Sequence, residues 1–360
     1  MTADRPPRRV VARTLAWAGR SVRRRAGAFV TDGFYRTATR VGRLHPLARP
    51  ARHDVEVLRD VPYRPTGRIE HRLDVYRPRR RTGPAPCVLY LHGGGFRILS
   101  KDSHWMMGMA FARRGYVVFV PSYRLAPRHR YPAAIDDVAA VYAWVVGHAG
   151  RYDADPARLV VAGESAGGNL ALGLTVAACF DRPESFARRV FETAVVPSAT
   201  IAACGMLQVT DPERFLRRRR LPAFIADRLV EVRDAYLGPS DPPPAPAPSF
   251  ADPLRIVEGD ATEQRPLPPI FAPVGTKDPL LDDTRRLARA VARRGGTCWD
   301  RYYEGAGHAF HAFMLTRAAR ACWEDTFEFL ARAGVGPVLD APAADPLADL
   351  GWPFRWRTGA

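Results

Sequence analysis

Five residues at positions 163–167, Gly-Glu-Ser-Ala-Gly, place a serine between an apolar run and a segment rich in small residues. This order predicts a strand (159–162), a sharp turn with Ser165 at its apex, and a helix (169–178). A serine hydroxyl is a weak nucleophile, so it must stand clear of the backbone, beside a base and N–H groups that hold negative charge. Glycines two residues before and after leave room for such a turn. The alternative is a Gly/Ser loop in which Ser165 only caps the helix.

Three consecutive glycines, Gly93 to Gly95, follow His92 and a second apolar run at residues 87–91. Glycine lets the backbone come close to a substrate and turn its N–H groups inward. The N–H groups of Gly93 and Gly94, together with that of Ala166, could hold the negative oxygen that forms when a serine attacks a carbonyl carbon. A phosphate-binding loop is the alternative, but neither common glycine-rich phosphate signature is complete here.

An acid that orients the base is expected just after an apolar strand at residues 269–274. Asp278 follows this strand through Gly-Thr-Lys and precedes a proline that can begin a helix. Asp282 and Asp283 are its rivals, but they lie one helical turn further on and we expect them to face solvent. Asp278 is therefore the predicted acid.

The predicted base is His308, which lies in the sequence Gly-Ala-Gly-His-Ala-Phe just past a strand at residues 297–303. Flanking glycines suit a loop that carries the imidazole back over the serine. His311 is expected inside the next helix (312–333) as a surface or packing residue, and no further ligand cluster supports a His308/His311 metal pair. The order Ser, Asp, His along the chain is that of α/β-hydrolases.

Strands and helices alternate through most of the chain, which predicts a mostly parallel, doubly wound sheet with ligands at the carboxyl ends of its strands. Residues 55–62 and 69–76 precede this alternation and are expected to form an edge hairpin. Short basic helices and a Pro/Ala linker between about 205 and 265 predict a cap inserted between core strands. The core elements are expected at residues 87–91, 103–114, 116–120, 133–146, 159–162, 169–178, 269–274, 280–294, 297–303 and 312–333.

The chain resembles the hormone-sensitive-lipase-like family of bacterial carboxylesterases, on the α/β-hydrolase fold. The shared blocks stand in the family's order and at its approximate spacing. They are His92-Gly93-Gly94-Gly95-Phe96, Tyr123-Arg124-Leu125-Ala126-Pro127, Tyr131-Pro132-Ala133-Ala134, Ser165-Ala166-Gly167-Gly168-Asn169, Asp278-Pro279-Leu280 and His308-Ala309-Phe310. Two positions depart from the pattern, because the family usually has Asp where Glu164 stands and Glu where Arg128 stands.

The resemblance implies a cap built from N-terminal helices plus an insertion, and hydrolysis of carboxylic esters with short or medium acyl chains. Ser165 would attack the ester carbonyl, His308 would take its proton and Asp278 would hold the imidazole, with no metal or organic cofactor. The substrate would be a small-molecule ester or lipid. Amide, lactone or carbamate hydrolysis fits the same machinery, and a non-catalytic binding protein on this fold is the remaining alternative.

Positive charge is concentrated near the N-terminus, since residues 1–53 hold 13 Arg and two Asp and so carry +11 of the net +17. This asymmetry favours an acidic partner surface, and a basic amphipathic helix within residues 1–45 could lie on anionic lipid headgroups. The alternative is a solvated Arg-rich helix packed on the rest of the fold. Nucleic acid is not an expected partner, because no reading motif accompanies the charge.

We divide the chain into the basic N-terminal region (1–53), a catalytic domain (54–335) that includes the cap insertion, and a Pro-rich tail (336–360). Five scattered cysteines without a C-x-x-C pair are typical of a reducing compartment. No apolar run approaches the roughly 20 residues of a membrane span. The expected location is the cytoplasm, with peripheral contact to the inner membrane face as one option. The oligomeric state is left open, a dimer included.

Overall fold

The computed structural model describes residues 33, 37, 39, 41–43, 48–80, 83–218, 220–238 and 249–337. Most of the basic N-terminal region and of the Pro-rich tail lie outside these residues, and so does the expected lipid contact. Within the described ranges, no helix has the length and apolar character needed to cross a membrane.

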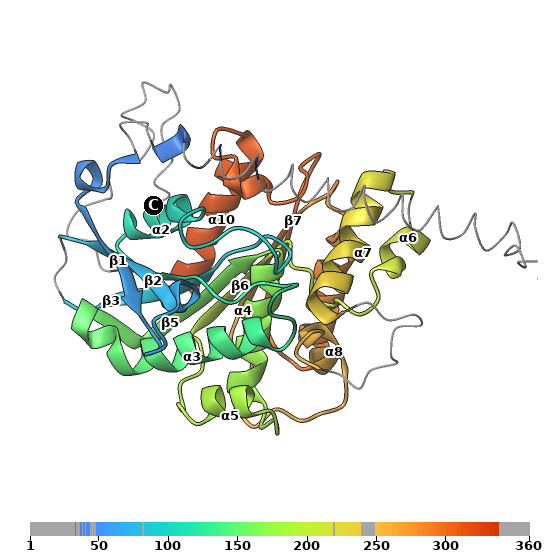
Figure 1. Ribbon diagram of the computed structural model, residues 1–360, viewed down its shortest axis with the longest axis horizontal. Helices are drawn as coiled ribbons and strands as arrows, with labels where there is room; N and C mark the ends of the chain where they lie inside the picture. Colours follow the sequence, from blue (N-terminus) through green and yellow to red (C-terminus); the bar gives the residue numbers. More distant parts are fainter. Residues whose placement is uncertain are drawn as a thin grey trace, which may run out of the picture.

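The described strands form one mixed sheet of eight (Figure 1). In sheet order they are β1 (Val55–Pro62), β2 (Arg72–Pro78), β4 (Val117–Pro121), β3 (Ala85–Leu91), β5 (Ala154–Glu164), β6 (Ala199–Ala203), β7 (Ile270–Gly275) and β8 (Cys298–Tyr303). The pairs β1–β2 and β2–β4 are antiparallel, and all other neighbours are parallel. Because β3 is covered on both faces, its seven residues are all buried and form an unbroken apolar run.

Helices cover both faces of the sheet. The described helices are α2 (Trp105–Ala112), α3 (Ala133–His148), α4 (Ala166–Cys179), α5 (Ser185–Phe191), α6 (Glu213–Arg218), α7 (Ala223–Leu237), α8 (Pro253–Glu258), α9 (Leu281–Arg293) and α10 (Arg317–Arg332). Alternate side chains of a strand point to opposite layers. In β3, Leu89 joins the core beneath α3, α4 and α9, whereas Val88 and Tyr90 join the core beneath α2 and α10. The strand that leads into the glycine loop is thus fixed from both sides.

The predicted α/β-hydrolase architecture and the antiparallel edge pair are confirmed, with local differences. Residues 69–71 form a 3₁₀ turn, so β2 starts at Arg72. Helix α10 starts at Arg317 rather than at 312, because the Thr316 side chain caps it by accepting from the N–H of Ala319. The seven-residue α5 and six-residue α8 were not expected, since such short helices carry less than two apolar periods.

The segment at about 205–265, predicted to be a cap, contains α6, α7 and α8. Helix α7 lies against the glycine loop that follows β3. Tyr236 of α7 stacks on Phe96 of the loop with ring centroids 3.8 Å apart, and Glu231 forms an ion pair with Arg97. A Cβ on Gly95 would come within 2.7 Å of the Val232 side chain. One helix of the segment is therefore packed directly on the loop.

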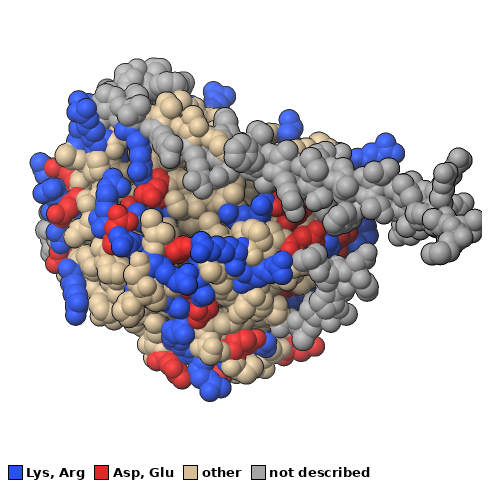
Figure 2. Space-filling model, viewed as in Figure 1, with Lys and Arg blue, Asp and Glu red and all other residues tan. Residues whose placement is uncertain are grey.

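Charged side chains are interspersed on the described surface. Figure 2 shows Lys and Arg mixed with Asp and Glu on the face in view. Arg124, for example, donates to Asp136 at 3.0 Å and to Asp137 at 2.8 Å. In the described part of the chain, nearby carboxylates thus neutralise the charge of many arginines. The concentrated excess of +11 belongs to residues 1–53.

Candidate active site

Ser165 stands at the apex of the turn between β5 and α4. Its backbone has φ +56° and ψ −117°, a strained combination for a residue with a side chain. The serine side chain makes no capping hydrogen bond to α4 (Ala166–Cys179), so helix capping does not explain it. The turn instead lifts the hydroxyl away from the backbone, as a nucleophile requires.

The glycines around the serine are required by close backbone contacts. A Cβ on Gly163 would lie 2.4 Å from the carbonyl oxygen of Gly167. A Cβ on Gly167 would lie 2.0 Å from the carbonyl oxygen of Leu91, the last residue of β3. Real Cβ atoms do not approach so closely, and a packed core cannot yield by that amount. The serine turn and the end of β3 are therefore pressed together, which brings the glycine loop beside Ser165.

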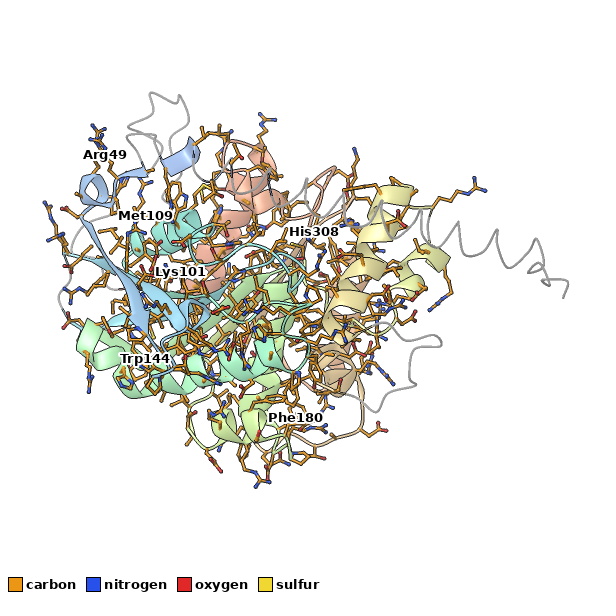
Figure 3. The ribbon with its side chains drawn as sticks, viewed as in Figure 1. Arg49, Lys101, Met109, Trp144, Phe180 and His308 are labelled. Carbon is orange, nitrogen blue, oxygen red and sulfur yellow. The ribbon has the colours of Figure 1, made fainter. Side chains whose placement is uncertain are left out.

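The structure brings the three predicted catalytic side chains into one hydrogen-bonded row. His308 Nε2 lies 3.0 Å from Ser165 Oγ, and His308 Nδ1 lies 2.9 Å from Asp278 Oδ2. The Asp278 side chain is fully buried, and its other oxygen accepts from the N–H of Leu280 at 2.8 Å. Because Oδ2 can only accept when ionised, Nδ1 carries a proton, and in the neutral ring Nε2 is then free to accept from the serine hydroxyl. Figure 3 marks His308 in the loop that follows β8.

The Asp278 carboxylate sets the charge preference of His308. Burial disfavours the imidazolium, but the adjacent carboxylate outweighs burial and raises the pKa of His308 well above its ordinary value. The Cys204 thiol lies beside the same imidazole, and burial raises the pKa of Cys204. The thiol therefore stays protonated near neutral pH. The site is built to stabilise a positive charge on His308 once it has taken a proton.

A metal ion does not fit this cluster as it stands. Among the described residues, Cys204, Asp278 and His308 form a group whose ligand atoms lie within 4.8 Å of one another. Zinc needs bonds of about 2.0–2.3 Å to each ligand. His308 Nδ1 and Asp278 Oδ2 are already in hydrogen-bond contact at 2.9 Å, and a metal would have to break that bond.

Three expectations about neighbouring residues need correction. Asp283 does not face solvent: it is buried, pairs with Arg214 at 2.6 Å and accepts from the N–H of Leu207 at 2.9 Å. Asp282 is also largely covered, with a side chain 19% exposed. His311 lies in a short 3₁₀ turn before α10, not inside that helix, and is buried. Neither aspartate contacts His308 in the way that Asp278 does.

The prediction that Gly93 supplies an oxyanion donor is wrong for this conformation. Its N–H donates to the Glu164 carboxylate at 2.5 Å, so that donor is occupied. Gly93 is buried, whereas Gly94 and Gly95 are partly exposed and have φ +107° and +59°. Among the described residues, the N–H groups of Gly94 and Gly95 have no backbone acceptor.

Ala166 remains a candidate donor. It is the first residue of α4, where a helix leaves N–H groups without an intrahelical partner. The candidate oxyanion donors are thus Gly94 and Ala166, with Gly95 as the second position in the loop. The triple glycine left this choice open, because glycine spacing does not say which N–H another side chain will occupy.

Sequence reasoning did not assign two buried polar side chains that lie next to the glycine loop. Glu164 was noted only as a departure from the family, and His104 was not singled out. The structure joins them at 2.7 Å beneath the glycine loop. Nothing in the spacing links the two, which are 60 residues apart, although an acidic residue at the end of a buried strand does require a partner. The other departure, Arg128, is exposed.

Comparison with known proteins agrees with this geometry. A family model described as alpha/beta hydrolase fold matches residues 88–312. Carboxylesterase NlhH of Mycobacterium tuberculosis is 34% identical over 211 residues, 58% of this chain and 61% of that protein. An acetyl esterase of Salmonella paratyphi B is 29% identical over 249 residues, 68% of this chain and 72% of that protein. The solved structure of esterase LipW from Mycobacterium marinum is 26% identical with a TM-score of 0.66, covering 85% of this chain and 90% of that one.

The matched region contains every candidate residue named above, from Gly93 to His308. The chain spans about three fifths of the length of the first relative, 61% of it. The family model covers more than half of the chain. The chain therefore belongs to the α/β-hydrolase family, and its resemblance to the hormone-sensitive-lipase-like carboxylesterases is confirmed.

Proposed function

We propose that this chain is a serine esterase that hydrolyses carboxylic esters with short or medium acyl chains. The observation that carries the proposal is the row of two hydrogen bonds from Ser165 through His308 to the buried Asp278. The similarity to proteins named as esterases supports ester hydrolysis as the reaction. Every step can be assigned to side chains and backbone groups of the chain itself.

The reaction begins when Ser165 Oγ attacks the ester carbonyl carbon while His308 Nε2 takes the hydroxyl proton. Asp278 keeps the proton of the ring on Nδ1 and stabilises the imidazolium. The N–H groups of Gly94 and Ala166 hold the negative oxygen of the tetrahedral intermediate. His308 then protonates the leaving alcohol, and the acyl group stays on Ser165. A water molecule activated by His308 releases the acid by the reverse sequence.

The insertion at about 205–265 is proposed to act as the cap over this site. Support comes from α7, whose Tyr236 and Glu231 hold Phe96 and Arg97 of the glycine loop. The glycine loop that α7 contacts carries the proposed oxyanion donor Gly94. The cap would therefore influence both acyl-chain selection and the shape of the oxyanion site.

Amide, lactone and carbamate hydrolysis use the same groups, and a binding protein on this fold would not need them. A binding protein has no use for an imidazole held 3.0 Å from a strained serine. The half-exposed His308 and the buried counter-charge of Asp278 favour catalysis. We therefore place ester hydrolysis first.

Two butyrate esters with different leaving groups are expected to give the same ratio of methyl butyrate to butyric acid when methanol is added. Both 4-nitrophenyl and phenyl butyrate would form the same butyryl-enzyme. Methanol and water then compete for that intermediate in a proportion that does not depend on the ester from which it formed. Gas chromatography of the products measures the ratio, and protein with Ser165→Ala supplies the background. A ratio that depends on the leaving group would contradict the shared intermediate.

A further inference from the structure

Glu164 is the last residue of β5 and is bonded covalently to Ser165, yet its side chain serves the glycine loop. One oxygen, Oε1, accepts from the N–H of Gly93 at 2.5 Å and from His104 Nε2 at 2.7 Å. The other oxygen accepts from the hydroxyl of Tyr90 on β3. The side chain is 6% exposed. A single carboxylate thus ties the nucleophile's strand to β3, to the glycine loop and to the start of α2.

The His104 ring lies between the Glu164 carboxylate and the turn at Ser100–Ser103. Nδ1 lies 2.9 Å from the hydroxyl oxygen of Ser103 and 3.3 Å from the carbonyl oxygen of Ser100. The Ser103 hydroxyl donates to that same carbonyl at 2.7 Å, so towards His104 it can only accept. Nε2 faces the Glu164 carboxylate, which also accepts. Both ring nitrogens are therefore in hydrogen-bond contact, and His104 Nε2 faces the buried Glu164 carboxylate.

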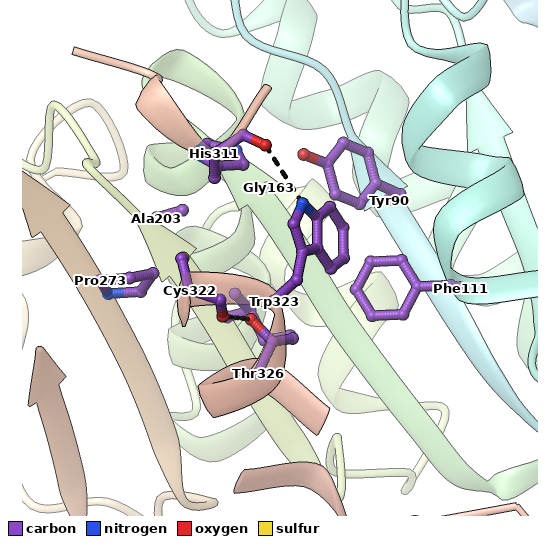
Figure 4. Close-up of a pocket in the computed structure, with 10 residues that line it drawn as sticks. Tyr90, Phe111, Gly163, Ala203, Pro273, His311, Cys322, Trp323 and Thr326 are labelled. Carbon is purple, nitrogen blue, oxygen red and sulfur yellow. Dashed lines mark hydrogen bonds between the residues drawn. The ribbon is translucent and has the colours of Figure 1, made fainter. Parts of the chain in front are cut away.

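The Glu164 carboxylate is ionised, and two further histidines near it are neutral. Burial alone would raise the pKa of Glu164, but His104 and the hydrogen bond from Tyr90 lower it to about 2. Burial lowers the pKa of His92 to about 3 and that of His311 to about 4, so both rings are neutral. Figure 4 shows Tyr90 and His311 among the residues that line a small cavity. Trp323 there donates to the carbonyl oxygen of His311 at 3.1 Å.

Position 93 requires a glycine because its backbone lies against Glu164. A Cβ at Gly93 would approach Glu164 Oε1 to 2.7 Å and the Glu164 carbonyl oxygen to 2.9 Å. The backbone of Gly93 does not have a positive φ, so conformation is not the reason for a glycine there. The glycine loop therefore packs directly on the Glu164 side chain. Any movement of the carboxylate is passed to the neighbouring N–H of Gly94.

We propose that Glu164, paired with His104, is a positioning residue that fixes the oxyanion loop relative to the serine turn. This inference rests on the proposed esterase function. Glu164 adjoins Ser165 in the chain and Gly93 adjoins Gly94, so one hydrogen bond sets the distance between nucleophile and oxyanion donor. Aspartate is one methylene shorter, so from this backbone position it cannot hold both Gly93 and His104.

The test compares Glu164→Gln and Glu164→Asp with the wild type. Glutamine keeps the size, but its single oxygen leaves either Gly93 or Tyr90 without an acceptor. A displaced oxyanion donor stabilises the transition state less well. Both variants are therefore expected to lower kcat about 10²-fold. KM should stay within about threefold, since ground-state binding does not use that donor. Kinetics with 4-nitrophenyl butyrate measure both constants, and thermal unfolding monitors the fold.

An alkyl trifluoromethyl ketone supplies a second readout that a merely structural role would not move. It forms a hemiketal with Ser165 whose oxyanion occupies the proposed donors, so its inhibition constant should rise by the same factor as kcat/KM falls. The matched control is Glu56→Gln, which removes a carboxylate paired with Arg77 at the sheet edge and should leave kcat and the inhibition constant unchanged.

His104→Gln approaches the same pair from the other side and keeps the test decisive where Glu164 variants fold poorly. This substitution is expected to lower kcat about tenfold and to raise the inhibition constant of the ketone by the same factor. A folded Glu164→Gln or His104→Gln protein with wild-type kcat would overturn the inference, as would a lower kcat with unchanged ketone affinity. Wild-type protein that neither hydrolyses the ester nor binds the ketone would instead refute the proposed function.

Discussion

Replacing Ser165 with alanine is expected to lower kcat for 4-nitrophenyl butyrate by about 10⁶-fold, which is the scale of losing the nucleophile of a serine hydrolase. The substitution removes the atom that His308 Nε2 contacts at 3.0 Å. Cys204 cannot replace it, because burial raises the pKa of its thiol and keeps it protonated. Steady-state assays with purified protein measure the loss. The midpoint of thermal unfolding should stay close to that of the wild type, since the serine hydroxyl caps nothing in α4.

A matched control is Ser198→Ala. The Ser198 hydroxyl donates to the carbonyl oxygen of Ala157 at 2.9 Å, at the opposite end of β5 from the serine turn. This control should retain wild-type kcat. Ester hydrolysis at the wild-type rate in a folded Ser165→Ala protein would show that another group is the nucleophile.

The second large effect is expected from Asp278→Asn, which should lower kcat by about 10⁴-fold. Asp278 uses one oxygen to accept from the N–H of Leu280 and the other to accept from His308 Nδ1. An amide placed here would keep its oxygen towards Leu280 and turn its NH₂ group towards Nδ1. The ring would then carry its proton on Nε2, where it cannot accept from Ser165. Steady-state assays of the purified variant measure the loss of kcat.

The pH profile of the same variant separates this cause from a loss of structure. His308 must be neutral to take the serine proton, and Asp278 raises the pKa of His308 above its ordinary value. The wild-type kcat/KM should therefore rise with pH along a limb above the ordinary imidazole range. In Asp278→Asn the raising charge is gone, so the limb should move to lower pH. An unchanged limb would mean that Asp278 does not act on His308.

The fold and the proximity of Ser165, His308 and Asp278 were predictable because they depend on local signals. The apolar runs that became β3, β5 and β7 are short and bounded by breakers, and a residue of the candidate site follows each of them within three positions. The Gly-Glu-Ser-Ala-Gly turn has a steric requirement that two glycines meet visibly in the sequence. Asp278 and His308 lie in the loops that follow β7 and β8, so the parallel sheet brings them to one edge.

What escaped prediction depends on contacts between distant segments. Gly93 was assigned to the oxyanion because its partner, Glu164, is 71 residues away and its side-chain direction cannot be read from spacing. Asp283 was expected in solvent, since helix periodicity does not show that α6 would bring Arg214 onto it. Charge pairs of this kind are fixed by tertiary packing. A buried acid therefore has to be located before its role can be assigned.

The Glu164 position illustrates how a departure from a family pattern acquires a physical meaning. Glutamate reaches Gly93 and His104 together, at 2.5 and 2.7 Å, while its backbone belongs to the serine turn. The longer side chain therefore matches the distance between strand and loop in this chain. Sequence alone offered no account of the exchange, because its consequence lies in the position of a neighbouring N–H.

The most direct test of Ser165 as the nucleophile is labelling with a fluorophosphonate, followed by peptide mapping with mass spectrometry. An activated serine attacks the phosphorus, its proton passes to His308, fluoride leaves and the phosphonyl group stays on Oγ, whereas an unactivated hydroxyl does not react. We predict one phosphonyl group per chain, on the peptide that contains Ser165, with labelling abolished in Ser165→Ala. Unlabelled wild-type protein, or a label on any other residue, would contradict the central claim.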